Sequence, residues 1–367
     1  MEAVDYIPRL IKACLDNDRR LVESVALVIS RKMHHDYPNL SKEIASALAS
    51  GNSQVSARAA GVNPLPVDRE TRFLLAEFSE PLDLDEPILD AHAGKEITDF
   101  LRERSLIEQF FKNDIEPSNS ILFVGDPGVG KTHTAHWLAG ELRMPLISLD
   151  LATSISSYLG RSGQNIKSVF DYARSQPSVL LLDEFDAIAK RRDDEGDLGE
   201  LKRLVNVLLK EIECCPKSSI ILAATNHPEL LDKAIWRRFD RVVEIRKPGK
   251  NERKKIIDRH LSRKQYKLAS SIRDYIAKCS EGFSAADICK LCEHIKRQAL
   301  MNPDEDLRVL ALVELYSRCK PETAAKKREA CIKLKSIGAN LTTREIGQIV
   351  GASAATVSRN LKEVNND

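Results

Sequence analysis

The stretch SILFVGDPGVGKTHTAHW, residues 120–137, decides the fold. It predicts a short apolar strand over 121–124, a glycine-rich turn and a helix that begins near Lys131. The turn fits the spacing G-x-x-x-x-G-K-[ST], in which backbone N–H groups surround a phosphate and the helix N-terminus faces the same anion. The lysine of this pattern reaches the β- and γ-phosphates, and the hydroxyl that follows it can bind Mg²⁺. The candidate nucleotide-binding residues here are Gly125, Asp126, Pro127, Gly128, Val129, Gly130, Lys131, Thr132 and His133.

Composition leaves room for several domains and excludes some classes of protein. The chain has 367 residues, of which 43% are hydrophobic and 30% charged, and a net charge of +2. Such a balance is typical of a globular protein and gives no general attraction to nucleic acid or membranes. No apolar run approaches the roughly 20 residues of a membrane span, and residues 1–20 contain no signal-peptide core, so we expect a cytoplasmic protein without a membrane partner.

Eight cysteines raise the question of a disulfide or metal framework. The one cluster is Cys289-x-x-Cys292-x-His294, and no second ligand pair accompanies it. Because a structural zinc site needs four ligands, we expect reduced, buried thiols in place of a metal site.

The apolar pattern divides the chain into five parts. Residues 1–50 predict a helical N-terminal module. Residues 51–66 are rich in Gly, Ser, Ala and Pro, and a linker is predicted over 51–79. A nucleotide-binding unit follows over 80–248, with a helix expected over 97–111. Beyond it the pattern becomes wholly helical over 249–320, and residues 321–367 differ again.

Strands and helices alternate within the nucleotide-binding unit. We expect strands at 146–149, 179–182, 220–224 and 242–245, separated by helices at 131–142, 163–174 and 199–213. Near-continuous apolar strands between helices indicate a parallel sheet covered on both faces, that is, an α/β fold.

Two strands end in residues suited to phosphate chemistry. Asp183 and Glu184 follow the strand at 179–182, where Asp183 can hold Mg²⁺ and Glu184 can orient and deprotonate a water molecule. Asn226 follows the next strand and can position that water, although Asn also favours turns after strands.

Five blocks in order resemble the AAA-family (AAA+) ATPases, the group of NSF, katanin, spastin and FtsH. They are GDPGVGKT (125–132), SYLG (157–160), LLLDEFDAIAKRR (180–192), AATNHPELLDKAIWRRFD (223–240) and GFSAADI (282–288). The fourth is similar to the second region of homology in the katanin and spastin branch. The resemblance implies a P-loop AAA+ sheet flanked by helices and a helical lid, with an N-terminal helical module and a C-terminal helix-turn-helix added.

The resemblance also implies roles for single residues. Asn226 corresponds to sensor 1, Ala285 belongs to an element near the adenine, and Arg237 and Arg238 correspond to arginine fingers that act on ATP in a neighbouring subunit. Trp236 departs from the family pattern, which leaves open which arginine is the main finger. Each arginine could instead form a surface ion pair.

A ring of subunits follows from the same resemblance, expected to be hexameric. Tyr158 and Leu159 then belong to a pore loop that grips an extended protein substrate, since an aromatic ring offers a large contact surface. The alternative is a tyrosine packed on the surface of the domain. No H-E-x-x-H or G-x-S-x-G motif occurs, so proteolysis would require a separate effector protein.

The last part of the chain resembles helix-turn-helix units of bacterial repressors. Residues 333–364 predict two helices joined at 351–353. The candidate DNA contacts are Ser353, Thr356, Ser358, Arg359 and Lys362. From residue 321 onward eight Lys and Arg oppose five Asp and Glu, a modest excess, and such units also serve protein contacts.

Three functions remain open on sequence alone. The first is a ring ATPase, using ATP and Mg²⁺, that remodels or threads proteins. The second is a DNA-associated regulator of replication, transposition or defence, whose ATPase controls assembly. A weaker third is a signalling switch that presents its nucleotide state through residues 1–50.

Overall fold

The computed structural model describes residues 74–152, 162–187, 198–262, 264–319, 323–337 and 340–362, together with Val25, Ile29 and Pro66. The predicted N-terminal module at 1–50 therefore lies outside the described residues, apart from two buried helical positions. The chain divides into two compact units, residues 1–64 and 65–367. The fold and the site below belong to the second unit.

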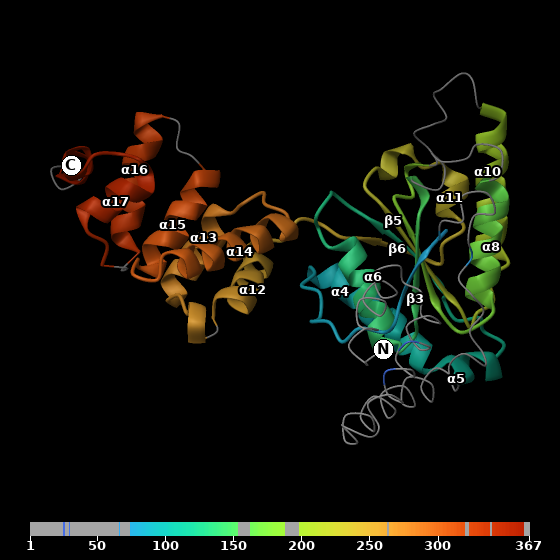
Figure 1. Ribbon diagram of the computed structural model, residues 1–367. Helices are drawn as coiled ribbons and strands as arrows, with labels where there is room; N and C mark the ends of the chain where they lie inside the picture. The colour runs from blue at the N-terminus through green and yellow to red at the C-terminus, as the bar shows by residue number, and fades with distance from the viewer. Residues whose placement is uncertain are drawn as a thin grey trace. The chain divides into compact units, whose positions relative to one another are not determined.

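A six-stranded sheet forms the centre of the nucleotide-binding part (Figure 1). Its order is β1-β3-β4-β5-β2-β6, and only β1 runs antiparallel to its neighbour. The strands are β1 (Glu77–Ser79), β2 (Ser120–Val124), β3 (Leu146–Asp150), β4 (Val179–Asp183), β5 (Ile220–Thr225) and β6 (Arg241–Glu244). The predicted parallel sheet is confirmed, and β1 falls inside the range predicted as linker.

The apolar strands are buried on both faces, as their sequences indicate. Every residue of β2 and β5 is buried. In β2, Leu122 and Val124 belong to one buried cluster and Ile121 and Phe123 to another, because successive side chains point to opposite faces of the sheet. Parallel pairing brings the carboxyl ends of β2, β4 and β5 to one edge, where polar residues follow each strand.

Helices cover both faces of the sheet. In Figure 1, α4 (Ala91–Ser105) and α6 (Lys131–Glu141) lie on one side of the strands, and α8 (Ser162–Arg174) and α10 (Leu198–Glu213) on the other. The helix predicted over 97–111 is instead two helices, α4 and α5 (Ile107–Lys112). The break lies at Leu106, whose backbone N–H still bonds to the last turn of α4 while its φ of −104° departs from helical geometry.

The remainder of the chain is helical and shares one buried core. Its elements are α12 (Lys250–Leu261), α13 (Ser270–Cys279), α14 (Ala285–Met301), α15 (Leu307–Arg318), α16 (Ala324–Ser336), α17 (Thr343–Val350) and α18 (Ala354–Lys362). One hydrophobic cluster runs from Ile256 in α12 to Val357 in α18. The boundary predicted at residue 320 therefore crosses continuous packing, in which α15 contacts α17.

Candidate active site

The phosphate loop follows β2 and leads directly into α6. Gly125 has a φ of +149°, and a Cβ at this position would lie 2.1 Å from the carbonyl oxygen of Ile245. No side chain fits there, since the loop passes against the end of β6. Gly130, with a φ of +110°, is the last residue before the helix, so the first N–H groups of α6 face the loop.

The lid helix α14 bonds to the same loop. The backbone N–H of Ala286 donates to the carbonyl oxygen of Gly128 at 2.9 Å. A Cβ on Gly128 would meet the Ser284 hydroxyl at 2.9 Å, so glycine permits this close approach. Ser284 and Asp287 form a capping box at the start of α14, and the bonds from Ser284 lower the pKa of the Asp287 carboxyl. The lid thus begins at the phosphate loop.

Lys131 connects the loop to the strand edge. Its side chain is nearly buried, and its ammonium donates to the carbonyl oxygens of Gly125 and Asp126 at 2.7 and 2.9 Å. A third bond, 2.7 Å long, reaches the side-chain oxygen of Asn226. Burial lowers the pKa of Lys131, while the charges of Asp183, Asp126 and Asp186 oppose that shift.

Thr132 and Asp183 form a pair of oxygen ligands. The hydroxyl of Thr132, in α6, donates to the carboxylate of Asp183, at the end of β4, at 3.0 Å. A hydroxyl and a carboxylate at this separation, beside a phosphate loop, fit the ligand preferences of Mg²⁺. These two residues would hold the ion.

Glu184 stands at a sharp turn immediately after β4. Its φ is +51°, a left-handed conformation that is uncommon outside glycine and is found at functional sites. Three bonds hold the turn: Glu184 N–H to the Asp183 carboxylate, Phe185 N–H to the carbonyl of Ala224, and Ala187 N–H to the carbonyl of Glu184, all at 2.9 Å. The Glu184 side chain is left exposed at the cavity wall.

Asp186 is a site residue that sequence reasoning missed. Its buried carboxylate accepts bonds from the Thr225 hydroxyl at 3.1 Å and from the Asn226 N–H at 3.2 Å. It therefore fixes the end of β5 and the start of the segment that carries Asn226. The only signal in the sequence is one more acidic residue in the run DEFD.

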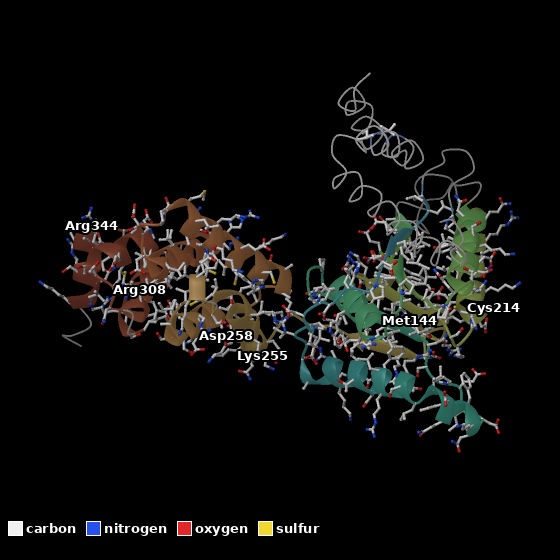
Figure 2. The ribbon with its side chains drawn as sticks, turned by 60° about the horizontal axis from the view of Figure 1, so that its bottom comes forward. Met144, Cys214, Lys255, Asp258, Arg308 and Arg344 are labelled. Atoms are coloured by element: carbon white, nitrogen blue, oxygen red, sulfur yellow. The ribbon has the colours of Figure 1, made fainter. Side chains whose placement is uncertain are left out.

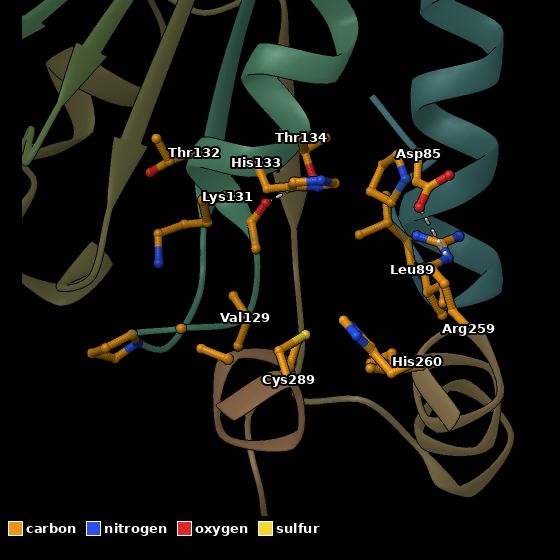
Figure 3. A pocket seen from close by; sticks show the side chains of 18 of the residues that line it. Asp85, Leu89, Val129, Lys131, Thr132, His133, Thr134, Arg259, His260 and Cys289 are labelled. Atoms are coloured by element: carbon orange, nitrogen blue, oxygen red, sulfur yellow. Dashed lines mark hydrogen bonds and ion pairs between the residues drawn. The ribbon is translucent and has the colours of Figure 1, made fainter. Parts of the chain in front are cut away.

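A cavity of about 810 Å³ joins these groups to an apolar region. Figure 3 shows Lys131, Thr132 and His133 on one side of it, with Cys289 and His260 opposite. The pKa of His133 is lowered mainly by burial and, to a smaller extent, by the positive charge of Arg259. Sequence reasoning does not indicate the rest of this wall, which comes from the segment before α4 and from the helices α12 and α14. It consists of Asp85, Pro87, Ile88, Leu89, Ile256, Arg259, His260, Cys289, Glu293 and Lys296.

Most predicted nucleotide-binding residues line this cavity, together with the predicted catalytic residues Glu184 and Asn226. They are Pro127, Gly128, Val129, Gly130, Lys131, Thr132, His133, Asp183, Glu184, Asn226 and Ala285. Gly125 and Asp126 do not line it and instead act through the carbonyl oxygens that hold Lys131. The Asp126 carboxylate forms an ion pair with Lys247 at 3.1 Å.

The two candidate arginine fingers lie outside the cavity of their own chain. Arg237 and Arg238 follow α11 (Lys233–Trp236), and both are exposed. Arg238 forms an ion pair with Glu213 at the end of α10. The predicted pore-loop residues Tyr158 and Leu159 lie outside the described residues.

Residues 121–247 match the family model described as "ATPase family associated with various cellular activities (AAA)". The match spans β2, the phosphate loop, Asp183, Glu184 and Asn226, that is, the residues brought together here. This chain carries an AAA-family ATPase domain. The cofactors of the AAA domain are ATP and Mg²⁺, and its reaction is ATP hydrolysis.

Curated relatives support the same assignment of the AAA domain. The AAA family ATPase y4kL of Sinorhizobium fredii is 36% identical over 210 residues, which cover 57% of this chain and 64% of that protein. The ATP-dependent zinc metalloprotease FtsH of Helicobacter pylori is 33% identical over 252 residues, covering 66% of this chain and 39% of the relative. The chloroplastic ATP-dependent zinc metalloprotease FTSH 7 of Arabidopsis thaliana is 35% identical over 206 residues, covering 54% of this chain and 25% of the relative. The chain thus spans a quarter to about two thirds of the length of these relatives.

A solved structure supports the fold of the AAA domain and its lid. The FIGL-1 AAA domain superposes with a TM-score of 0.55 at 20% identity, covering 71% of this chain and 90% of that one. The predicted AAA+ fold class is confirmed. The closer likeness to the katanin and spastin branch stays a prediction. No helix within the part of the chain that the structure describes has the length and apolar character to cross a membrane.

Proposed function

We propose that the chain is an ATP-driven machine whose active site is completed by a second copy. The observation that supports this most directly is that the candidate arginine fingers lie apart from the other catalytic residues. Lys131, Glu184 and Asn226 line one cavity, whereas Arg237 and Arg238 are exposed beyond it. Arginines so placed could reach the triphosphate of a neighbouring copy.

Each group in the cavity has a distinct task. The loop amides and the Lys131 ammonium bind the β- and γ-phosphates, and Thr132 and Asp183 hold Mg²⁺, which neutralises charge on those phosphates. Asn226, fixed by Asp186, orients the attacking water. The Glu184 carboxylate accepts a proton from that water while the water oxygen bonds to the γ-phosphorus. The bond from the γ-phosphorus to the β-phosphate oxygen breaks, and ADP leaves.

The arginine of the neighbouring copy would complete this site. A guanidinium at the γ-phosphate stabilises the charge that develops in the transition state, a contribution of about 10³–10⁵ in rate where an arginine finger acts. Arg238 would have to leave its exposed ion pair with Glu213, which costs little.

Mixing two defective variants tests this arrangement. Arg238→Ala and Lys131→Ala spoil different halves of a shared site, so their mixture should recover part of the ATPase rate that neither variant has alone. Mixing Lys131→Ala with Glu184→Gln is the matched control, because both lesions fall in the same half. If no ratio of the first pair exceeds the control, catalysis between copies is refuted.

We propose protein as the substrate, in a ring expected to be hexameric. The support is the match to relatives named ATP-dependent zinc metalloproteases, of which this chain covers 25% and 39%, and the sequence SYLG at 157–160. Tyr158 and Leu159 would grip the extended substrate, and a separately encoded effector such as a protease would act on it.

A DNA-associated regulator is the second candidate function. It is favoured by the C-terminal arrangement of two helices, α17 and α18, joined by only three residues. Tyr158→Ala distinguishes the two functions. If the variant loses the stimulation of its ATPase rate by unfolded protein but still binds DNA, remodelling is supported. If DNA stimulates the ATPase rate equally in the variant and the unmodified chain, the regulator is supported.

A further inference from the structure

Residues 84–89 join two buried cores of the molecule. They precede α4 and form neither helix nor strand. Leu84 and Leu89 pack against the buried cluster between the sheet and the helices α4 and α6, whereas Ile88 packs against the cluster of the lid helices. One short stretch of chain therefore contacts both the nucleotide-binding part and the lid. We call residues 84–89 the bridging segment.

Arg259, in α12, bonds directly to the bridging segment. Its guanidinium donates to the backbone carbonyl oxygen of Glu86 at 2.8 Å, and its Nε lies 4.0 Å from the Asp85 carboxylate (Figure 3). Because Glu86 belongs to no helix or strand, the guanidinium supplies the hydrogen bond that its carbonyl requires. Pro87 favours this arrangement, since a residue before proline avoids helical backbone. A charged hydrogen bond and an ion pair thus tie α12 to the bridging segment.

This contact lies at the end of the cavity away from the phosphate loop. Figure 3 shows Asp85, Leu89 and Arg259 on one side of the cavity and Lys131 and Thr132 on the other. A nucleotide whose phosphates are bound at Lys131 therefore extends its ribose and base toward the bridging segment.

The wall at this end suits a purine ring. Ile88 and the buried Ile256 line it and offer apolar surface. Burial, and then the charge of Arg259, lowers the pKa of His133, while the Asp85 carboxylate opposes this shift. Both charged groups therefore lie close to the wall of the cavity, beside its apolar side chains.

We propose that Arg259 is a positioning residue that holds the bridging segment against the base end of the bound nucleotide and so slows the release of ADP. The inference rests on the proposed function, in which the cavity binds the nucleotide. The bridging segment lines the base end while it stays packed on both cores, and the Arg259 contact opposes its withdrawal. Since product release limits the turnover of many enzymes, Arg259 acts on the ATPase rate through release and not through the chemical step.

Displacement of a fluorescent ADP analogue measures this release. The full chain is loaded with the analogue and mixed rapidly with excess unlabelled ADP, and Arg259→Ala is compared with the unmodified chain. The matched control is Lys255→Ala, which removes the same charge one turn earlier on α12, at an exposed position outside the cavity wall (Figure 2). We expect roughly fivefold faster release from Arg259→Ala, because a partly exposed charged contact is lost, and no change in the control.

The chemical step distinguishes this role from a general loss of structure. In a single turnover with the protein in excess, the hydrolysis rate of Arg259→Ala should change by less than about twofold. The reason is that Lys131, Glu184 and Asn226 lie at the phosphate end of the cavity. Damage to the fold would instead lower Tm and slow hydrolysis as well.

Asp85→Ala is a second test, at an exposed residue whose truncation leaves the packing intact. If Arg259 holds the bridging segment, this variant should also release the analogue faster, by about twofold, since an exposed ion pair contributes little. If Arg259 instead touches the nucleotide, loss of the nearby carboxylate should slow release or leave it unchanged, because that charge repels the phosphates.

Two results would overturn the proposal. One is equal release from Arg259→Ala and Lys255→Ala, and the other is slower or unchanged release from Asp85→Ala. Lys131→Ala tests the cavity separately. If that variant still loses nucleotide binding when either result is found, the role of Arg259 is refuted while the nucleotide site stands.

Discussion

At the scale of single residues, Lys131 unites three parts of the site through one ammonium group. It bonds to Gly125, Asp126 and Asn226, and it faces the place of the phosphates. We expect Lys131→Ala to weaken ATP binding at least tenfold, because a charged hydrogen bond contributes about 1.5–3 kcal/mol. Titration with a fluorescent ATP analogue measures this, and an affinity within about threefold of the unmodified chain would contradict the role assigned to Lys131.

Glu184 should affect hydrolysis and leave binding intact. Glu184→Gln keeps the shape of the side chain but cannot accept a proton, so we expect the ATPase rate to fall at least about 100-fold with ATP affinity little changed. Glu141→Gln, at an exposed position at the end of α6, is the control. Normal turnover by the Glu184 variant would show that another group is the base.

Asp186 acts through Asn226. Asp186→Asn keeps the volume of the side chain but loses the charge that two donors share, so Asn226 should shift and its control of the water weaken. We expect kcat to fall roughly tenfold while KM stays close to its original value. An equal rise in KM with constant kcat would indicate a role in binding instead, and steady-state kinetics separates the two outcomes.

At the scale of elements, two helical glycines offer a matched comparison. Gly94 in α4 has open space where a Cβ would be, whereas a Cβ on Gly140 in α6 would lie 2.2 Å from the carbonyl oxygen of Leu82. Gly94→Ala should therefore stabilise the fold by about 0.5–1 kcal/mol, and Gly140→Ala should destabilise it by roughly 1–3 kcal/mol. Urea unfolding of both variants checks the signs, and the same sign for both would contradict the described contact between α6 and residue 82.

The elements that sequence reasoning located well are those whose own residues specify them. The apolar runs of β2 to β5 are buried on both faces, so composition alone identifies them. The three-residue strand β1 was missed because it exists only by pairing with β3. The break at Leu106 was missed for a related reason, since the apolar pattern continues through it.

The candidate site divides in the same way. The residues at the phosphates follow strands directly, so their spacing along the chain predicts their proximity. The wall formed by Ile88, Ile256 and Cys289 comes from segments that only tertiary packing brings together. Asp186 differs from its acidic neighbours only in its burial, which sequence does not display.

At the scale of the whole molecule, the helical core predicts the effect of truncation. Leu334, Ile346 and Val357 are almost fully buried in the cluster that also contains α12 to α15. Ending the chain at residue 320 should expose α15 and lower Tm by roughly 5 °C or more, since 1 kcal/mol already shifts Tm by about 2–4 °C in a domain of 150–250 residues. A chain ending at residue 362, which keeps α18 complete, is the control for calorimetry. An unchanged Tm after the longer truncation would show that the last helices are an independent domain.

The bond between Ala286 and Gly128 has a mechanical consequence. One end of α14 touches the loop that grips the nucleotide, and the body of the same helix is embedded in the core that reaches Val357. If α14 tilts as the triphosphate is cleaved, the last three helices should therefore move with it, because they pack in the same core. A partner bound to those helices would then be displaced each time an ATP is hydrolysed.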